Sequence, residues 1–207
     1  KQASKQSVVQ FKQAPLPFVG QKRMFLKHFE TILNENIKDD GEGWTIIDTF
    51  GGSGLLSHAA KRLKPKARVI YNDFDGYAER LAHIDDINTL RSQLFTAVGN
   101  ATLKNKRMPK ELKAECIRII QAFDGYKDLN CLASWLLFSG EQVATLDELF
   151  QNNFWHCIRR SDYPKADGYL DGVEIVRESF HTFLPKFGDD PKVLFALDPP
   201  YLCTRQE

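Results

Sequence analysis

A strand, a glycine turn, a helix and a second strand follow one another between residues 44 and 73. The apolar run 44–50 (WTIIDTF) ends in the turn 51–54 (GGSG), after which apolar residues recur at helical spacing over 55–63. The run 67–73 (ARVIYND) is apolar and closes on an acidic residue. A connecting helix makes the two flanking strands parallel, so this segment predicts a βαβ unit and an α/β fold.

Two further strands are expected late in the chain, at residues 172–176 (GVEIV) and 193–197 (VLFAL). Polar or acidic residues follow each expected strand, and in an open parallel sheet such strand ends share the edge where ligands bind. Residues 76–168 lack this pattern and show helical periodicity instead. Helices are expected near residues 78–94, 109–123, 129–138 and 145–154. The expected organisation is a domain made of 1–75 and 169–207, interrupted by a helical insertion at 76–168.

The composition is that of an ordinary globular protein, with 43% hydrophobic and 27% charged residues. The formal net charge is only +1, so contact with a nucleic acid would depend on a local basic surface. The four cysteines are far apart and form no C-x-x-C pair, which argues against a disulfide framework and a zinc site. No apolar run has the roughly 20 residues of a membrane span, and residues 1–13 lack the apolar core of a signal peptide, so a cytoplasmic protein is expected.

The glycine turn is the first candidate site. Glycines between a strand and a helix let the backbone approach a ligand closely, although such a turn could also be purely structural or serve a dinucleotide. Asp73 sharpens the interpretation, because it ends the next strand and a carboxylate there can accept hydrogen bonds from both hydroxyls of a ribose. Asp75 is the alternative for that role. Together these residues predict a site for a nucleoside-containing cofactor.

The second candidate site is Asp198-Pro199-Pro200-Tyr201, which directly follows the apolar run 193–197. Consecutive prolines stiffen the turn and remove two backbone donors. An aromatic amine such as adenine N6 is a poor nucleophile, and two acceptors aimed at its N–H bonds would favour the reactive, localised form. The Asp198 carboxylate and the Pro199 carbonyl are candidates for those acceptors, and Tyr201 is a candidate for stacking on a base removed from its duplex. The alternative is a proline turn that merely ends a strand.

These motifs resemble, in order, those of the Dam-like alpha-group DNA adenine-N6 methyltransferases. Residues 17–22 (PFVGQK) resemble the F-x-G-G-K box, 48–54 (DTFGGSG) match D-x-F-x-G-x-G, and 198–201 match D-P-P-Y. The resemblance implies a Rossmann-like S-adenosylmethionine-dependent fold, with 76–168 in the place of the target-recognition region. It also implies a set of cofactor-binding residues: Phe18, Lys22, Asp48, Phe50, Gly52, Gly54 and Asp73.

Two features depart from the family pattern. Gln21 stands where a second glycine is usual, and the strands that follow D-P-P-Y in the family are missing, including a final hairpin. The natural protein is therefore expected to be longer than this chain.

For DNA contact, the candidates are basic residues in the insertion: Lys104, Lys106, Arg107, Arg159 and Arg160. Such side chains can neutralise phosphates, and the two arginines lie among aromatic residues, although lysine-rich helix starts are often only solvated faces. The histidines lack ligand spacing, and no metal is implied.

The sequence thus predicts direct methyl transfer from S-adenosylmethionine to adenine N6 in double-stranded DNA, as in restriction-modification systems. An RNA adenine or cytosine-N4 amino methyltransferase, and an inactive homologue that binds DNA, remain alternatives. The recognition sequence, the biological role (restriction partner, phage protection or regulation) and the oligomeric state cannot be derived from these residues.

Overall fold

The computed structural model describes residues 11–98, 106–138 and 140–199. These residues form two compact units. The first, here called the α/β unit, contains residues 11–14, 18–79 and 166–199, and the second, here called the helical unit, contains residues 15–17 and 80–165. Pro200, Tyr201 and Lys104, which the sequence analysis singled out, lie outside the described residues.

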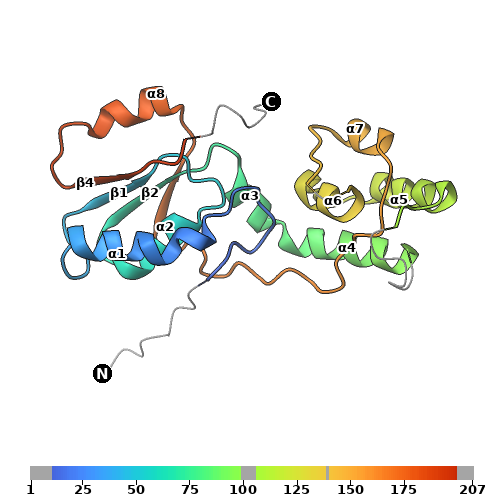
Figure 1. The fold of residues 1–207 in the computed structure, drawn as a ribbon, viewed down its shortest axis with the longest axis horizontal. Helices are drawn as coiled ribbons and strands as arrows, with labels where there is room; N and C mark the ends of the chain where they lie inside the picture. The colour runs from blue at the N-terminus through green and yellow to red at the C-terminus, as the bar shows by residue number, and fades with distance from the viewer. Residues whose placement is uncertain (1–10, 99–105, 139, 200–207) are drawn as a thin grey trace, which may run out of the picture. The chain divides into compact units, whose positions relative to one another are not determined.

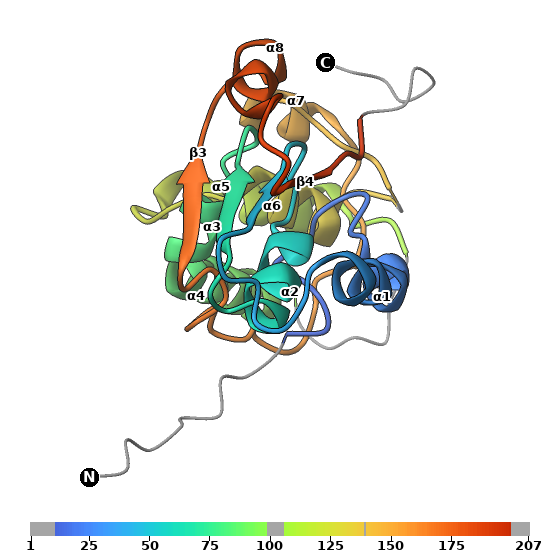
Figure 2. The same cartoon turned by 90° about the vertical axis from the view of Figure 1, so that its left-hand side faces the viewer.

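The α/β unit is built on a parallel sheet whose described strands run in the order β3-β2-β1-β4 (Figure 2). The strands are β1 (Thr45–Asp48), β2 (Arg68–Asn72), β3 (Val173–Val176) and β4 (Val193–Ala196). The sheet and the helices beside it fit the Rossmann-like fold that the sequence motifs imply.

Side chains of alternate residues pack on opposite faces of this sheet, as expected for strands buried on both sides. Ile46 and Val69 contact one cluster together with residues of α1 (Leu26–Asn36) and α2 (Leu55–Leu63), and Figure 1 shows these two helices together along the sheet. Ile47 and Ile70 contact Phe183 on the other face. Phe183 ends the short helix α8 (Phe180–Phe183), which continues into a 3₁₀ turn, η3 (Leu184–Phe187). Another 3₁₀ turn, η1 (Arg23–Phe25), precedes α1.

The described residues between β2 and β3 form the helices α3 (Tyr77–Ala82), α4 (Ile84–Val98), α5 (Lys110–Ala122), α6 (Leu129–Leu136) and α7 (Leu146–Gln151). The helical unit has its own apolar interior, to which α4, α5 and α6 contribute Leu94, Ile120 and Trp135. It also contains a buried ion pair, because Arg80 Nε lies 2.6 Å from Asp128 Oδ2. Asp128 also accepts a hydrogen bond from the Cys131 backbone N–H and so caps the start of α6.

Two expected helices differ from the observed ones. The helix expected over 78–94 is interrupted at His83, whose backbone N–H bonds to Arg80 O in a tighter, three-residue turn. The helix expected over 145–154 ends at Gln151. The following residues are extended and pair with the segment around Met108, whose N–H bonds to Phe154 O. Long-range backbone pairing therefore overrides the local helical pattern there.

Candidate active site

The glycine turn and Asp198 lie at the same edge of the sheet in the α/β unit. Strands β1 and β4 are neighbours with Asp48 opposite Ala196, so the turns that follow them leave the sheet side by side. Thr49 N–H bonds to Ala196 O at 3.2 Å, which extends this pairing by one residue into the glycine turn. The third segment at this edge is the end of β2, where Tyr71 lies opposite Asp48. Three of the predicted site segments are therefore brought together.

The glycine turn is held in place by aromatic side chains. The hydroxyl groups of Tyr71 and Tyr169 lie 2.6 Å from Gly52 O and 2.9 Å from Ser53 O, respectively. A Cβ atom added to Gly51 would lie 2.2 Å from the Tyr71 ring, so only glycine fits beneath that ring. Sequence reasoning did not identify Tyr71 as the residue that requires Gly51, because a tyrosine within a strand gives no signal of what its ring covers.

Gly52 and Gly54 have positive φ angles of 49° and 67°, which glycine adopts most readily. A Cβ on Gly52 would lie 2.8 Å from the Phe18 ring, so Phe18 packs directly on the turn. Gly54 is the N-cap of α2, and the turn therefore passes straight into the helix N-terminus. Backbone N–H groups at a helix N-terminus favour the binding of anionic groups, and Asp48 already accepts one of them from Ser57.

Asp48 links β1 to the start of α2. Its side chain is buried, with 4% of the residue exposed, and its Oδ2 accepts a 2.8 Å hydrogen bond from the Ser57 hydroxyl in the first turn of α2. Burial raises the Asp48 pKa from 3.8 to about 6, although the bonds from Ser57 act in the opposite direction. The charge of Asp198 also raises this pKa. Asp48 is thus a positioning residue for the glycine turn in this structure.

Asp73 caps α3 with its carboxylate. Oδ1 accepts a 2.7 Å hydrogen bond from Tyr77 N–H, and Oδ2 accepts a 2.8 Å bond from Ala78 N–H. The Tyr71 hydroxyl lies 2.9 Å from Oδ1 and shares its one proton between Asp73 and Gly52 O. An ionised carboxylate offers about four acceptor positions, so much of the capacity of Asp73 is already used. The sequence did not predict this capping role, and Asp75, the alternative, is exposed two residues further on.

The N-terminal segment of the α/β unit reaches both turns. Phe18 packs on Gly52 and makes an edge contact with Tyr77, the two ring centroids lying 5.7 Å apart. Lys22 forms an ion pair with Asp198 Oδ2. Residues that are close in sequence at the start of the chain therefore connect the glycine turn after β1 with the turn after β4.

Phe50, Asp198 and Pro199 lie further towards the surface. The Phe50 ring packs against Phe180 of α8, with their centroids 5.3 Å apart. The side chain of Asp198 is 32% exposed, and Pro199 is exposed. Among the described residues, Asp198 Oδ1 has no hydrogen-bond donor, so one carboxylate oxygen stays available as an acceptor.

One polar group at this edge was missed by sequence reasoning. Thr49 follows β1 and is 1% exposed, and its Oγ1 has no hydrogen-bond partner within the described part of the chain. Buried polar groups are almost always paired, so this hydroxyl is an exception, and it lies beside the glycine turn. A single threonine in a strand end carries no sequence signal for such an unpaired group.

The basic residues proposed for DNA contact belong to the helical unit and differ in their surroundings. Arg159 is half-buried, with its guanidinium 4.0 Å from the centre of the Tyr163 ring and bonded to Ser161 Oγ. Arg107 is exposed and donates a hydrogen bond to Asn153. Lys106 and Arg160 are exposed. Of these residues, Arg159 is held most firmly by its own loop.

The described residues contain neither a metal-binding cluster nor a membrane-spanning helix. No group of three or more His, Cys, Asp or Glu side chains there is arranged to hold a metal ion. Among the same residues, none of the helices combines the length and the apolar character needed to cross a membrane.

The chain is similar in sequence to a bacterial protein. It is 66% identical over 197 residues to a Haemophilus influenzae (strain Rd KW20) protein named "Putative methyltransferase", and the aligned region covers 95% of this chain and 67% of that protein. No family model matches the chain, and no solved structure matches it.

Proposed function

We propose that this chain, which belongs to the methyltransferase family of the Haemophilus influenzae protein, transfers a methyl group from S-adenosylmethionine to the N6 amino group of adenine in DNA. The observation that carries the proposal is the position of Asp198 beside the glycine turn, on neighbouring parallel strands. A cofactor held at the glycine turn would thus lie next to an amine held at Asp198.

The residues at the sheet edge suit this cofactor. S-adenosylmethionine supplies an electrophilic methyl group on a sulfonium, together with a ribose and an amino acid part that need polar partners. The unpaired Thr49 hydroxyl and the remaining acceptor capacity of Asp73 offer such partners. Phe18 and the backbone of Gly52 and Gly54 would pack against the bound cofactor.

The amine would be positioned by the turn after β4. Asp198 Oδ1 and the Pro199 carbonyl would each accept one N–H of the adenine amino group, which favours a lone pair localised on nitrogen. Lys22 would keep the carboxylate in place through its ion pair with Oδ2. As the new N–C bond forms, the S–C bond breaks, and the amine then loses one proton to solvent. No covalent enzyme intermediate is needed.

The helical unit is the candidate for selecting the DNA target, through exposed basic residues such as Lys106, Arg107 and Arg160. Methylation of adenine in RNA, or of cytosine at N4, would use the same amine chemistry. Nucleoside analysis of the methylated product would show which base is modified and whether it belongs to DNA or RNA. The acceptor left on Asp198, beside the glycine turn, favours a catalytic site over an inactive homologue.

The test compares Asp198→Ala with Asp189→Ala, which removes an exposed carboxylate away from the sheet edge. Asp198→Ala should lower methyl incorporation into duplex DNA by about a hundredfold or more, while its affinity for S-adenosylmethionine stays within a few fold of the unsubstituted protein. Asp189→Ala should behave as the unsubstituted protein does. Nucleoside analysis of the product should give N6-methyladenine. Full activity of Asp198→Ala would refute the assignment.

A further inference from the structure

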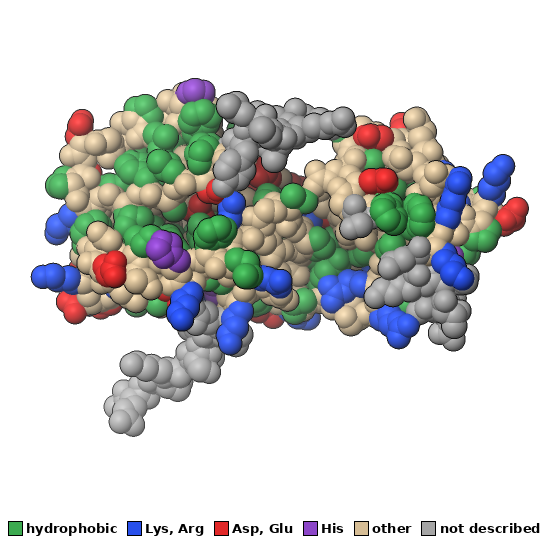
Figure 3. All heavy atoms as spheres, viewed as in Figure 1, with side chains coloured by type: hydrophobic (Ala, Val, Ile, Leu, Met, Phe, Trp, Pro, Cys, Tyr) green, Lys and Arg blue, Asp and Glu red, His purple; other side chains and the backbone are tan. Residues whose placement is uncertain are grey.

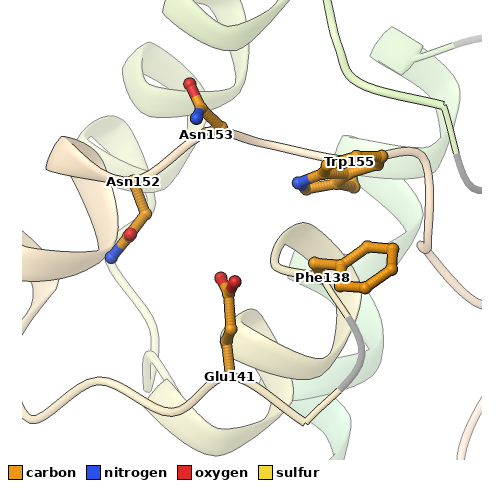
Figure 4. Close-up of a pocket in the computed structure, with 5 residues that line it drawn as sticks. All are labelled: Phe138, Glu141, Asn152, Asn153 and Trp155. Atoms are coloured by element: carbon orange, nitrogen blue, oxygen red, sulfur yellow. The ribbon is translucent and has the colours of Figure 1, made fainter.

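A hollow of about 200 Å³ lies in the helical unit, in a part of the chain that the proposed methyl transfer does not use. Its lining comes from the segment after α6 and from the segment after α7: Phe138, Glu141, Asn152, Asn153 and Trp155 (Figure 4). Sites for drug-sized ligands are usually larger, at roughly 300 to 1,000 Å³. The hollow therefore suits a small group such as one planar heterocycle.

One wall of the hollow is aromatic. The Phe138 and Trp155 rings lie with their centroids 4.8 Å apart, and Phe138 is 50% exposed. The backbone of Trp155 is fixed from behind, because its N–H bonds to Leu136 O and it forms a β-bridge with Arg107. Phe154, its neighbour in sequence, is fully buried. Of these two adjacent aromatic residues, one fills the core and the other is presented on a rigid support.

The other side of the hollow is polar. Figure 4 shows the Glu141 carboxylate pointing into it. Within the described part of the chain, this carboxylate has no ion pair or hydrogen bond, and the Trp155 Nε1–H has no acceptor. Asn153 accepts a hydrogen bond from Arg107 through Oδ1, which leaves its amide N–H groups as donors. A flat ligand here would meet an aromatic face, a carboxylate acceptor and two kinds of N–H donor.

Basic side chains contact the segment after α7, which lines the hollow. Lys113 Nζ donates to Asn152 O at 2.7 Å and lies 5.2 Å from the centre of the Phe154 ring. Arg107 binds Asn153, and Lys106 and Lys110 are exposed nearby in sequence. Figure 3 shows Lys and Arg side chains spread over the visible face, several of them on the part that carries α5. This charge favours a ligand attached to phosphates over a cationic side chain, which an aromatic pair and a carboxylate could otherwise bind.

We propose that this hollow binds one unstacked nucleobase of a nucleic acid strand. This inference rests on the proposed function, which takes DNA as the substrate. Aromatic stacking accepts any base, and the carboxylate selects among bases because it needs an N–H donor opposite it. Cytosine presents two N–H groups on N4, whereas thymine presents the O4 acceptor at the equivalent position and only one N–H, at N3, between two carbonyl oxygens that a carboxylate repels. The hollow therefore prefers cytosine to thymine, two bases of the same ring size.

The experiment measures the affinity of the full chain for short oligodeoxycytidylate and oligodeoxythymidylate of equal length. Fluorescence polarisation of labelled strands gives the dissociation constants, and quenching of tryptophan emission reports stacking on Trp155. The variant Glu141→Gln is compared with Glu111→Gln, which removes the same charge from α5 outside the hollow. Both variants lose one negative charge, so they match in their general attraction for phosphates.

The unsubstituted protein and Glu111→Gln should bind the cytidylate about tenfold more tightly than the thymidylate, and Glu141→Gln should lose this preference. Trp155→Phe should abolish the quenching. Equal affinity for the two strands in the unsubstituted protein, or a preference that survives in Glu141→Gln, overturns the proposal. If DNA is methylated while the preference is absent, only the base site fails. If the preference is present while DNA is not methylated, the base site stands and the proposed function fails.

Discussion

Replacement of Asp48 by asparagine should make the protein more stable at neutral pH, although it removes a charged residue at the candidate active site. Asp48 is almost fully buried, and its pKa is raised from 3.8 to about 6 by that burial. A raised pKa means that the folded state binds a proton more tightly than the unfolded state does. The resulting contribution to stability is fully present below pH 3.8 and is lost as the pH rises through about 6.

The size of this effect follows from the shift. A change of about 2 pKa units corresponds to about 3 kcal/mol, at 1.36 kcal/mol per unit. The introduced asparagine does not titrate and keeps an acceptor for the Ser57 hydroxyl, but its added N–H groups would need a partner, which costs about 1 kcal/mol or more at every pH. The informative quantity is therefore the pH-dependent part of the difference in unfolding free energy between Asp48→Asn and the unsubstituted protein.

Urea unfolding followed by circular dichroism from pH 4 to pH 8 measures it. The free energy of unfolding of Asp48→Asn, relative to the unsubstituted protein, should rise by about 3 kcal/mol across this range, mostly between pH 4 and pH 7. Asp189→Asn, at an exposed position, controls for the loss of one charge. A relative stability that falls with pH would mean that the α2 N-terminus stabilises the Asp48 carboxylate by more than burial penalises it, and would refute the reasoning.

Three other substitutions test the packing described above. Gly51→Ala should lower the free energy of unfolding by about 2 to 3 kcal/mol, because its Cβ would overlap the Tyr71 ring, whereas Gly188→Ala, with nothing within 4 Å, should have little effect in the same urea titration. Thr49→Val should raise stability by about 1 kcal/mol and weaken S-adenosylmethionine binding about fivefold by calorimetry; unchanged affinity would remove Thr49 from the cofactor site. Asp128→Ala should lower the free energy of unfolding by about 3 to 5 kcal/mol, because the buried Arg80 charge would lose the carboxylate of its ion pair, whereas loss of the exposed Lys66–Asp40 pair through Asp40→Ala should leave the unfolding midpoint nearly unchanged.

The elements that sequence predicted best are those specified by residues close together in the chain. The strand, glycine turn, helix and strand of 44–73 appear as β1, α2 and β2, and the late apolar runs appear as β3 and β4. Their parallel arrangement followed from the connecting helices, and the shared edge followed from the parallel arrangement. Each strand is a little shorter than the run expected from sequence, because each run also included one or more flanking residues that lie outside the strand.

The features that sequence did not predict depend on contacts between distant segments. The end of α7 is set by pairing of the next residues with the segment near Met108. The need for glycine at position 51 comes from the Tyr71 ring on the neighbouring strand. Asp73 was assigned to a ribose, but its bonds to α3 become visible only when the chain path after β2 is known. Neither propensity nor spacing contains this information.

The position of β4 has a consequence for how the protein is made. β1 is completed early, yet one of its edges pairs with a strand that the ribosome synthesises only after the whole helical unit and β3. During synthesis that edge of β1 offers unpaired backbone groups, and Lys22 is made long before its partner Asp198. The two turns that would hold cofactor and amine therefore cannot meet until β4 has been synthesised and has paired with β1.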